Sequence, residues 1–326
     1  MARTRRSDCH GPGIRRVRRG RGFSYHRADG TAVTEPDVLS RIRDLAIPPA
    51  WRDVWICPWP NGHIQAAGTD DAGRRQYLYH ADWRRRRDAE KFARVRSFGR
   101  ALPDLRRAVE SDLRAGGLER RTVLAAAVRL LDAGCFRVGG EEYAQANGTF
   151  GVATLRKDHV KIRDGRLRFD FEGKGSKRHQ VELRDDLLAP VVAQLKRRRG
   201  GGADLLAWKE DGRWVDVRSS DVNDYIKELS GGEYTAKDFR TWAATVAAAE
   251  GLAEQAHAGT RSTKKAVAEV MRDVARVLGD TPAVTRRSYV DPAVIDRFLD
   301  GTTIRAAARR SPAVESAVLE LLDQEG

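Results

Sequence analysis

Cysteine, methionine and long apolar runs are scarce in this 326-residue sequence. The three cysteines, Cys9, Cys57 and Cys135, are too few and too widely spaced for a disulfide framework or a zinc site, which is typical of a reducing compartment. No stretch approaches the roughly 18 consecutive apolar residues of a membrane-spanning helix, and no apolar segment follows the basic start as in a signal peptide. We therefore expect a cytoplasmic protein with no membrane partner.

Negative charge is also in short supply. Lys and Arg total 60 against 46 Asp and Glu, which gives a formal net charge of +14 and an isoelectric point near 10.1. Such a surplus attracts polyanions, and nucleic acid is the expected partner. An anionic membrane surface is the weaker alternative, because the basic residues are spread along the chain rather than gathered on one amphipathic helix. The length allows two domains, each with a core of its own.

The first 88 residues divide into a basic arm and a strand-rich domain. Residues 1–20 are rich in Arg and Gly and offer almost nothing to bury, which predicts a flexible arm. Residues 21–88 contain short β-type segments separated by turn residues and predict a small, mostly antiparallel domain. The strands are expected at Phe23–Tyr25, Asp53–Cys57, His63–Ala67 and Arg74–His80, and a helix at Pro36–Leu45.

The last of these strands mixes aromatic and basic side chains. Period-2 alternation places Arg75, Tyr77 and Tyr79 on one face and Gln76 with Leu78 on the other. Alternating tyrosines are typical of ordinary sheet packing. The interleaved arginine and glutamine also offer contacts to phosphates and base edges, so packing and DNA contact both stay open from this pattern alone.

Residues 89–326 predict a larger, mainly helical domain, because apolar residues recur at helical spacing in several segments. Three segments with alternating apolar residues, Val160–Ile162, Leu167–Phe171 and His179–Leu183, predict a three-stranded antiparallel sheet, with an Asp-Gly hairpin between the first two. The expected fold class is therefore α+β: a small strand-rich domain followed by a mainly α-helical domain that contains this sheet.

Two basic residues stand next to glycines in this second domain. Arg137 comes between an apolar helix and a glycine pair, where an ion pair with Glu141 or Glu142 is the ordinary expectation. Lys174 lies at the tip of a glycine-flexed loop and can swing into a site, although most lysines in such positions are simply solvated. Neither residue predicts a function by itself.

Two more basic residues lie near the start of a helix. Thr235 and Asp238 form a pair like a capping box at its N-terminus. Lys237 and Arg240 are three residues apart and therefore share one face of the helix, near an end that favours an anion.

Tyr289 lies at a predicted corner of the chain. The helix before it has a possible cap at Ser262 and stops at Gly279. Its apolar stripe consists of Val267, Val270, Val274, Val277 and Leu278. A short helix capped by Thr281 then follows, and Asp291 begins another. A tyrosine held in this way is either an ordinary half-buried residue or, with basic residues around it, a nucleophile.

Six motifs follow one another along the chain. They are IPPAW at Ile47–Trp51, GRRQYLYH at Gly73–His80, FRVG at Phe136–Gly139, GKG at Gly173–Gly175, KDFRTW at Lys237–Trp242 and LGDTPAVTRRSYVDP at Leu278–Pro292. In this order they resemble the catalytic and amino-terminal motifs of the type IB DNA topoisomerases of the bacterial and poxvirus kind. The resemblance covers nearly the whole chain after about residue 20.

This resemblance implies the roles of five residues. Tyr289 would attack the scissile phosphodiester, giving a 3′-phosphotyrosyl enzyme and a free 5′-hydroxyl. Arg137 and Arg240 would hold the non-bridging oxygens, while Lys174 would protonate the leaving 5′ oxygen with the assistance of Lys237. The chemistry agrees with these roles, because phosphoryl transfer depends on positioning and charge stabilisation, and the planar fork of arginine suits two oxygens of one phosphate.

The resemblance also implies double-stranded DNA as the partner. Gln76, Tyr77, Tyr79 and Tyr143 match positions that touch DNA in the family, and Arg75 is a further candidate. No cofactor is implied: we find no cluster of His, Cys and Asp with the ligand spacing of a metal site, and no Gly-Lys-Ser/Thr phosphate loop for ATP. We expect a nucleoid-associated monomer that clamps DNA between a strand-rich domain and a catalytic domain.

Asp280 departs from the family pattern, which usually has a histidine or asparagine nine residues before the tyrosine. An ionised carboxylate only accepts hydrogen bonds, and at about 4 Å it would repel a phosphate by roughly 4 kcal/mol at an effective dielectric of about 20. Three arrangements avoid this repulsion: a protonated carboxyl, a cap on the helix near Pro282, or an ion pair with Arg286, Arg287 or a catalytic arginine. We favour the cap, because aspartate is a preferred N-cap.

Two other functions compete with this interpretation. A tyrosine recombinase would share the chemistry, but that family usually has His-x-x-Arg where this chain has Lys237-x-x-Arg240, and its amino-terminal domain is typically a helical bundle. A DNA-binding protein with weakened cleavage is the second alternative, if Asp280 disables the site.

Overall fold

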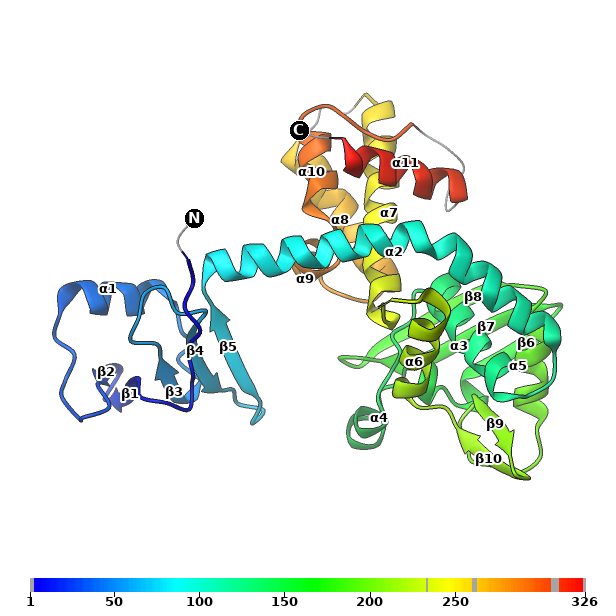
Figure 1. Cartoon of the computed structure of the whole chain (residues 1–326), viewed down its shortest axis with the longest axis horizontal. Helices are drawn as coiled ribbons and strands as arrows, with labels where there is room; N and C mark the ends of the chain where they lie inside the picture. The colour runs from blue at the N-terminus through cyan, green and yellow to red at the C-terminus, as the bar shows by residue number, and fades with distance from the viewer. Residues whose placement is uncertain (1–2, 233, 260–262, 306–310, 325–326) are drawn as a thin grey trace. The chain divides into compact units, whose positions relative to one another are not determined.

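The computed structural model describes residues 3–232, 234–259, 263–305 and 311–324. The chain divides into two compact units, residues 1–93 and residues 94–326, and the boundary falls inside one long helix, α2 (Ala81–Ala115) (Figure 1). The first unit is dominated by an antiparallel sheet and the second by helices, so the predicted α+β class is confirmed.

The first unit is a five-stranded sheet with one helix packed on it. Its elements are β1 (Ile14–Arg19), β2 (Gly22–His26), α1 (Pro36–Asp44), β3 (Arg52–Ile56), β4 (Ile64–Thr69) and β5 (Arg75–Tyr79). All strand pairs are antiparallel, in the order β2-β1-β3-β4-β5. Ile42 of α1 packs with Val54, Ile56 and Ala66 of the sheet in a small buried core. The strands and the helix predicted after residue 21 are all present within a few residues of their expected bounds.

Strand β1 contradicts the prediction of a flexible arm at residues 1–20. It is hydrogen-bonded between β2 and β3, and Ile14 is only 1% exposed. The Arg16 guanidinium donates to the backbone oxygens of Pro48 and Trp51, at 3.1 and 2.6 Å. The prediction was wrong because it rested on composition. Arginine stems can cover sheet surface while their charged ends stay in water, so a basic composition does not exclude a strand.

The second unit contains the remaining helices and two small sheets. Its elements after α2 are α3 (Arg120–Gly134), α4 (Glu141–Asn147), the 3₁₀ turns Val152–Thr154 and Lys157–His159, β6 (Val160–Arg163), β7 (Arg166–Gly173), β8 (Lys177–Arg184), α5 (Leu188–Arg197), β9 (Ala207–Glu210), β10 (Arg213–Asp216), α6 (Ser219–Ser230), α7 (Ala236–His257), α8 (Lys264–Leu278), α9 (Pro282–Ser288), α10 (Pro292–Leu299) and α11 (Pro312–Asp323).

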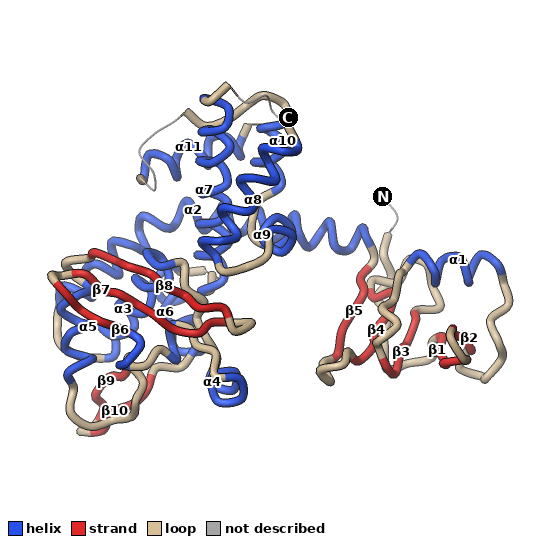
Figure 2. Tube along the Cα trace, turned by 180° about the vertical axis from the view of Figure 1, so that it is seen from behind, coloured by secondary structure: helices blue, strands red, loops and turns tan. Residues whose placement is uncertain are grey.

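Helix α7 is the centre of this unit. It contacts α3, α6, α8, α10 and α11 (Figure 1). The side chains of Phe239, Trp242 and Leu252 on this helix are buried in the core. The predicted antiparallel sheet is present in the order β6-β7-β8, and Figure 2 shows its three strands running side by side. Asp164 and Gly165 form the predicted hairpin turn, with φ angles of 50° and 71°.

Helices α8, α9 and α10 form the predicted corner. Gly279 ends α8 in the left-handed conformation at φ 64°, and the Thr281 hydroxyl caps α9 by accepting from the Val284 N–H. Ser262 lies outside the described residues, and the cap of α8 within them is Thr263. The stripe of α8 is buried as predicted except at Val277, which is 52% exposed. At 100° per residue Val277 lies on the flank of the stripe, while Leu278, the last residue of the helix, is buried.

Because β1 belongs to the sheet, Ile14→Ala should destabilise the first unit by about 2–5 kcal/mol, the usual cost of truncating a buried isoleucine. Val17→Ala on the same strand is the matched control, because Val17 is 40% exposed and its truncation should cost far less. Urea denaturation of both variants measures the difference. Equal, small losses would mean that residues 14–19 are an arm after all.

Candidate active site

The Asp280 carboxylate joins two arginines from distant parts of the second unit. Nη2 of Arg137, which follows α3, lies 2.8 Å from both carboxylate oxygens of Asp280. Nη2 of Arg240, on α7, lies 3.0 Å from Oδ2 of the same carboxylate. Arg240 is 3% exposed and also donates to the backbone oxygen of Leu278 at 2.8 Å. The turn between α8 and α9 is therefore bound directly to both predicted phosphate-binding residues.

This arrangement replaces two of our expectations. Asp280 is not the cap of α9, since Thr281 has that role. It takes the third arrangement that we considered, an ion pair with the candidate catalytic arginines. Glu141 is not the partner of Arg137 either, because its carboxylate accepts the N–H of Ser219 at 3.0 Å. Charge explains both results: two neighbouring guanidiniums attract the nearest carboxylate more strongly than a helix N-terminus does.

Both arginines keep hydrogen-bonding capacity in reserve. Nη1 of Arg137 and Nε of Arg240 are buried without a hydrogen-bond partner among the described residues. Buried donors of this kind are rare in proteins and are satisfied well by a tetrahedral oxyanion. Burial, and then the Arg137 charge, lowers the pKa of Arg240, but an arginine stays protonated at any physiological pH. The pair therefore offers a cationic site with unused donors.

Tyr289 stands beside Arg240 at the end of α9. It is half-buried, and the Arg240 guanidinium lies 5.3 Å from the centre of its ring. The N–H of Tyr289 donates to the Thr285 carbonyl oxygen at 3.0 Å, as expected for the last residue of a short helix. Arg286 and Arg287 are exposed in the last turn of α9. The prediction that Tyr289 lies at a held chain corner is confirmed.

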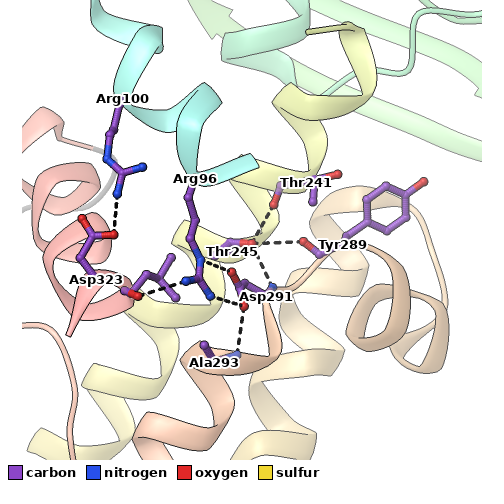
Figure 3. A network of polar contacts seen from close by, with 9 residues as sticks. Arg96, Arg100, Thr241, Thr245, Tyr289, Asp291, Ala293 and Asp323 are labelled. Atoms are coloured by element: carbon purple, nitrogen blue, oxygen red, sulfur yellow. Dashed lines mark hydrogen bonds and ion pairs between the residues drawn. The ribbon is translucent and has the colours of Figure 1, made fainter. Parts of the chain in front are cut away.

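A buried polar network holds the backbone on both sides of Tyr289 (Figure 3). The Thr245 hydroxyl donates to the Tyr289 carbonyl oxygen at 3.3 Å and accepts the Asp291 N–H at 3.2 Å. The Asp291 carboxylate, 2% exposed, accepts Nε and Nη2 of Arg96 at 2.9 and 3.2 Å and caps α10 through the Ala293 N–H at 3.0 Å. In Figure 3 the Tyr289 ring points away from this network, so the network fixes the backbone without using the hydroxyl.

The two predicted lysines are exposed. Lys174 is the first residue of the turn between β7 and β8, and Lys237 lies in the first turn of α7. Thr235 and Asp238 form the predicted cap of that helix, because the Asp238 carboxylate accepts the Thr235 N–H at 2.8 Å. Arg240 is buried and Lys237 is exposed to solvent, although the two are only three residues apart on α7.

Two further residues of β8 contact the same turn and were missed in the sequence. Nζ of Lys177 donates to the Asp280 carbonyl oxygen at 3.1 Å. The His179 ring packs against Gly279: a Cβ built on that glycine would lie 2.5 Å from Cε1 of His179. The available signal was the register of the hairpin, which places both residues opposite the end of β7, but nothing in the sequence reveals what this end touches.

The DNA-contact candidates of the first unit are divided between two faces of β5. Arg75, Tyr77 and Tyr79 are exposed on one face, and the two tyrosine rings lie 6.2 Å apart. Gln76 lies on the opposite face, where its amide donates to Asp70 at 2.9 Å. The predicted alternation is confirmed. Tyr143 falls in α4 of the second unit, and its side chain lies outside the described part of the structure.

Two observations concern ligands and membranes. Among the described residues, the potential metal ligands of Asp8, Cys9 and His10 lie within 4.8 Å of one another, so a cluster exists that our sequence analysis excluded. These residues are consecutive and belong to the first unit, and none is a catalytic candidate. Across all the residues that the structure describes, no helix is both long enough and apolar enough to span a membrane.

Two sequence models of known protein families match successive parts of the chain. The sequence model described as the catalytic core of eukaryotic DNA topoisomerase I matches residues 80–307, which is more than half of the chain. The model described as the N-terminal domain of bacterial DNA topoisomerase IB matches residues 22–70. The two matches follow one another in the same order as the two units.

Individual relatives extend these matches. DNA topoisomerase 1B of Acanthamoeba polyphaga mimivirus is 34% identical over 285 residues, which is 85% of each chain. DNA topoisomerase 1B of vaccinia virus (strain Copenhagen) is 23% identical over 240 residues, 72% of each chain. DNA topoisomerase 1 of Daucus carota is 30% identical over 48% of this chain but only 19% of its own length. The chain belongs to the type IB DNA topoisomerases.

One solved structure concerns the recombinase alternative. The site-specific recombinase XerH, in a pre-cleavage complex with its difH substrate, covers 60% of this chain and 51% of its own at a TM-score of 0.35 and 11% identity. A likeness at this level supports no conclusion about the function of this chain.

The Figure 3 network predicts unequal effects of two aspartate substitutions. Asp291→Asn should cost about 3–5 kcal/mol of unfolding free energy, because it leaves the Arg96 charge without its buried partner. Asp323→Asn is the matched control: its partner Arg100 is half exposed, and such pairs contribute at most about 1 kcal/mol. Chemical denaturation followed by circular dichroism compares them, and similar losses would refute the structural role of Asp291.

Proposed function

We propose that this protein relaxes supercoiled double-stranded DNA by transient cleavage of one strand, with Tyr289 as the nucleophile. The Tyr289 oxygen bonds to phosphorus and loses its proton to solvent, while the bond from phosphorus to the 5′ oxygen breaks and that oxygen gains a proton. The products are a 3′-phosphotyrosyl enzyme and a free 5′-hydroxyl, and religation is the reverse step. The proposal rests chiefly on Tyr289 lying beside Arg240, which shares the Asp280 carboxylate with Arg137, and on the unused buried donors of both arginines.

Arg137 and Arg240 would stabilise the charge that develops on the phosphate. Their guanidiniums carry two positive charges and donors that fit non-bridging oxygens, and the low exposure of Arg240 strengthens its electrostatic effect. Together they supply the cationic environment that a divalent metal supplies in other phosphoryl-transfer enzymes. We therefore propose a reaction that needs neither metal nor ATP, because the phosphotyrosine bond retains the energy of the cleaved bond.

Lys174 would protonate the leaving 5′ oxygen. An alkoxide is a poor leaving group, and a positioned acid contributes about 10²–10⁴-fold in rate. The lysine sits on a turn flanked by glycines, and the neighbouring Lys177 and His179 contact the turn that carries Asp280. Lys237 would assist from the first turn of α7, where its charge adds to the field around the phosphate.

Asp280 would hold the two arginines in place while DNA is absent. Without a carboxylate, two guanidiniums would face each other in a site of low polarity, and each would be destabilised by the other. When a DNA phosphate binds, its oxygens would accept hydrogen bonds from the same guanidinium donors, and the Asp280 carboxylate would have to move away from them. Asp280 therefore organises the site and competes with the substrate.

The first unit would contact DNA through the tyrosine face of its sheet. Directly paired residues share a face, and the pairs Arg15–Trp55, Trp55–Ala67 and Ala67–Tyr77 lead from β1 to β5. Arg15, and by alternation Arg19, thus lie on the face of Arg75, Tyr77 and Tyr79, while Arg18 lies on the other. Of the seven residues on this face, Trp55 and Ala67 are buried, and the other five expose side chains suited to phosphates or bases.

We further propose that the protein is a monomer, that it clamps DNA with both units, and that it acts on the nucleoid in the cytoplasm. The surplus of basic charge supports DNA as the partner. A tyrosine recombinase would need its own DNA sites, whereas relaxation requires none. Relaxation of a plasmid of arbitrary sequence therefore separates the two functions.

Tyr289→Phe should abolish relaxation of a supercoiled plasmid while leaving DNA affinity nearly unchanged, because one hydroxyl is removed and binding rests on many phosphate contacts. The unaltered protein should relax the plasmid in EDTA without ATP. Residual relaxation by the phenylalanine variant would exclude Tyr289 as the nucleophile, and a strict magnesium requirement would exclude the arginine-based mechanism.

Asp280→Asn should make cleavage faster and the protein less stable. The substitution removes the carboxylate that competes with phosphate, so single-turnover cleavage should rise by roughly tenfold, equivalent to about 1.4 kcal/mol. It also leaves two cations unpaired, so the melting temperature should fall. Asp273→Asn is the control, because its pair with Arg276 is on the surface. An Asn variant that cleaves tenfold more slowly would assign Asp280 a direct catalytic role.

Arg15→Ala and Arg19→Ala should each weaken DNA binding and reduce the slope of log affinity against log salt by about one, the effect of losing one phosphate contact. Arg18→Ala is the matched control, since it removes the same charge from the opposite face of β1. Affinity titrations at several salt concentrations measure the slopes. If all three variants change the slope equally, the loss reflects net charge alone, and β1 does not belong to the DNA-binding face.

A further inference from the structure

The hairpin that carries Lys174 extends beyond its sheet. Strand β6 pairs with β7 only from residue 166 to residue 169, whereas β7 and β8 pair from residue 166 to residue 173. The distal half, which ends in the Lys174 turn, is therefore two-stranded. Two-stranded ribbons are marginally stable in water, so this half needs contacts outside the sheet to hold its tip in one place.

The His179 ring provides such contacts, both within the hairpin and to the turn that precedes Asp280. It stacks on Phe171 of the neighbouring strand, with ring centres 5.4 Å apart and planes inclined by 12°. A Cβ on Gly173 would lie 2.4 Å from its Cδ2, and a Cβ on Gly279 would lie 2.5 Å from its Cε1. Either distance excludes a side chain, so the imidazole occupies a cradle that requires glycine at both positions.

One side of this cradle belongs to the hairpin and the other to the corner of the active site. Gly173 directly precedes Lys174, and Gly279 directly precedes Asp280. Lys177 adds a second link two residues along β8, through its 3.1 Å hydrogen bond to the Asp280 carbonyl oxygen. Burial, with the charges of Arg137 and Arg240, lowers the pKa of His179, so the ring is neutral at physiological pH and packs beside these cations without repelling them.

We propose that His179 is a positioning residue, which docks the Lys174 hairpin on the Gly279–Asp280 turn and so places the Lys174 ammonium at the leaving 5′ oxygen. The inference rests on the proposed role of Lys174 as the general acid. His179 itself does not touch the substrate. Its effect should fall mainly on the step that needs the proton, because the ion pairs of the Asp280 carboxylate with Arg137 and Arg240 do not involve His179.

The test compares cleavage of ordinary DNA with cleavage of DNA that has sulfur in place of the bridging 5′ oxygen. A thiolate leaves without a proton, so this substrate does not need the general acid. Lys174→Ala should cleave ordinary DNA at least about 100-fold more slowly and recover on the sulfur substrate. His179→Ala should lose roughly 10–100-fold on ordinary DNA, the scale of a displaced catalytic group, and recover likewise.

Two controls complete the design. Gln180→Ala alters the next residue of β8, on the opposite and exposed face, and should cleave both substrates at the original rate. The double variant Lys174→Ala/His179→Ala should cleave no more slowly than Lys174→Ala alone, because each substitution removes the same function, proton donation by Lys174. His179→Gln, which preserves a side chain of similar reach, provides the same comparison if the alanine variant does not fold.

The outcomes are distinguishable. Recovery of both single variants on the sulfur substrate supports the inference. Recovery of Lys174→Ala without recovery of the His179 variants, or multiplicative losses in the double variant, overturns the positioning role and leaves the proposed function intact. Failure of Lys174→Ala to recover overturns the general-acid role itself and the inference with it.

Discussion

The ion pairs between Asp280 and the two arginines are the interaction on which the active site depends. They join the segment after α3, the interior of α7 and the turn between α8 and α9, which are far apart in the sequence. A carboxylate between two guanidiniums neutralises part of their mutual repulsion in a buried setting. The two arginines are thus held together without DNA, but in the proposed function the group that holds them has the same charge as the phosphate that would bind there.

The other parts of the site are arranged around this turn. Downstream, Tyr289 ends the short helix α9, and the network of Thr245, Asp291 and Arg96 fixes its backbone. From the sheet, Lys177 and His179 reach the turn on the side of the Lys174 hairpin. One chain corner therefore connects the candidate nucleophile, the candidate phosphate-binding pair and the candidate acid, and a small displacement of it would disturb all three.

Much of this arrangement was predictable from local sequence. Thr281 and Asp291 followed by prolines mark helix starts, Gly279 marks a helix end, and Asp-Gly marks the β6–β7 hairpin, because each depends on a few neighbouring residues. The partners of charged groups were not predictable in the same way. Asp280 was expected to cap a helix, and the competition between a cap and two arginines is decided only when the fold brings those arginines within 3 Å. The strand β1 was missed for a related reason, since its burial depends on α1 and β3 rather than on its own composition.

The most direct test of the proposed mechanism is to identify the covalent bond between protein and DNA. A duplex with one labelled strand is incubated with the protein, the reaction is stopped with denaturant, and the adduct is digested and sequenced by mass spectrometry. The proposed mechanism predicts a single modified residue, Tyr289, joined to the 3′ phosphate of the cleaved strand, with a free 5′-hydroxyl on the other fragment. Attachment through another residue, attachment to a 5′ phosphate, or no adduct from a protein that relaxes DNA would contradict it.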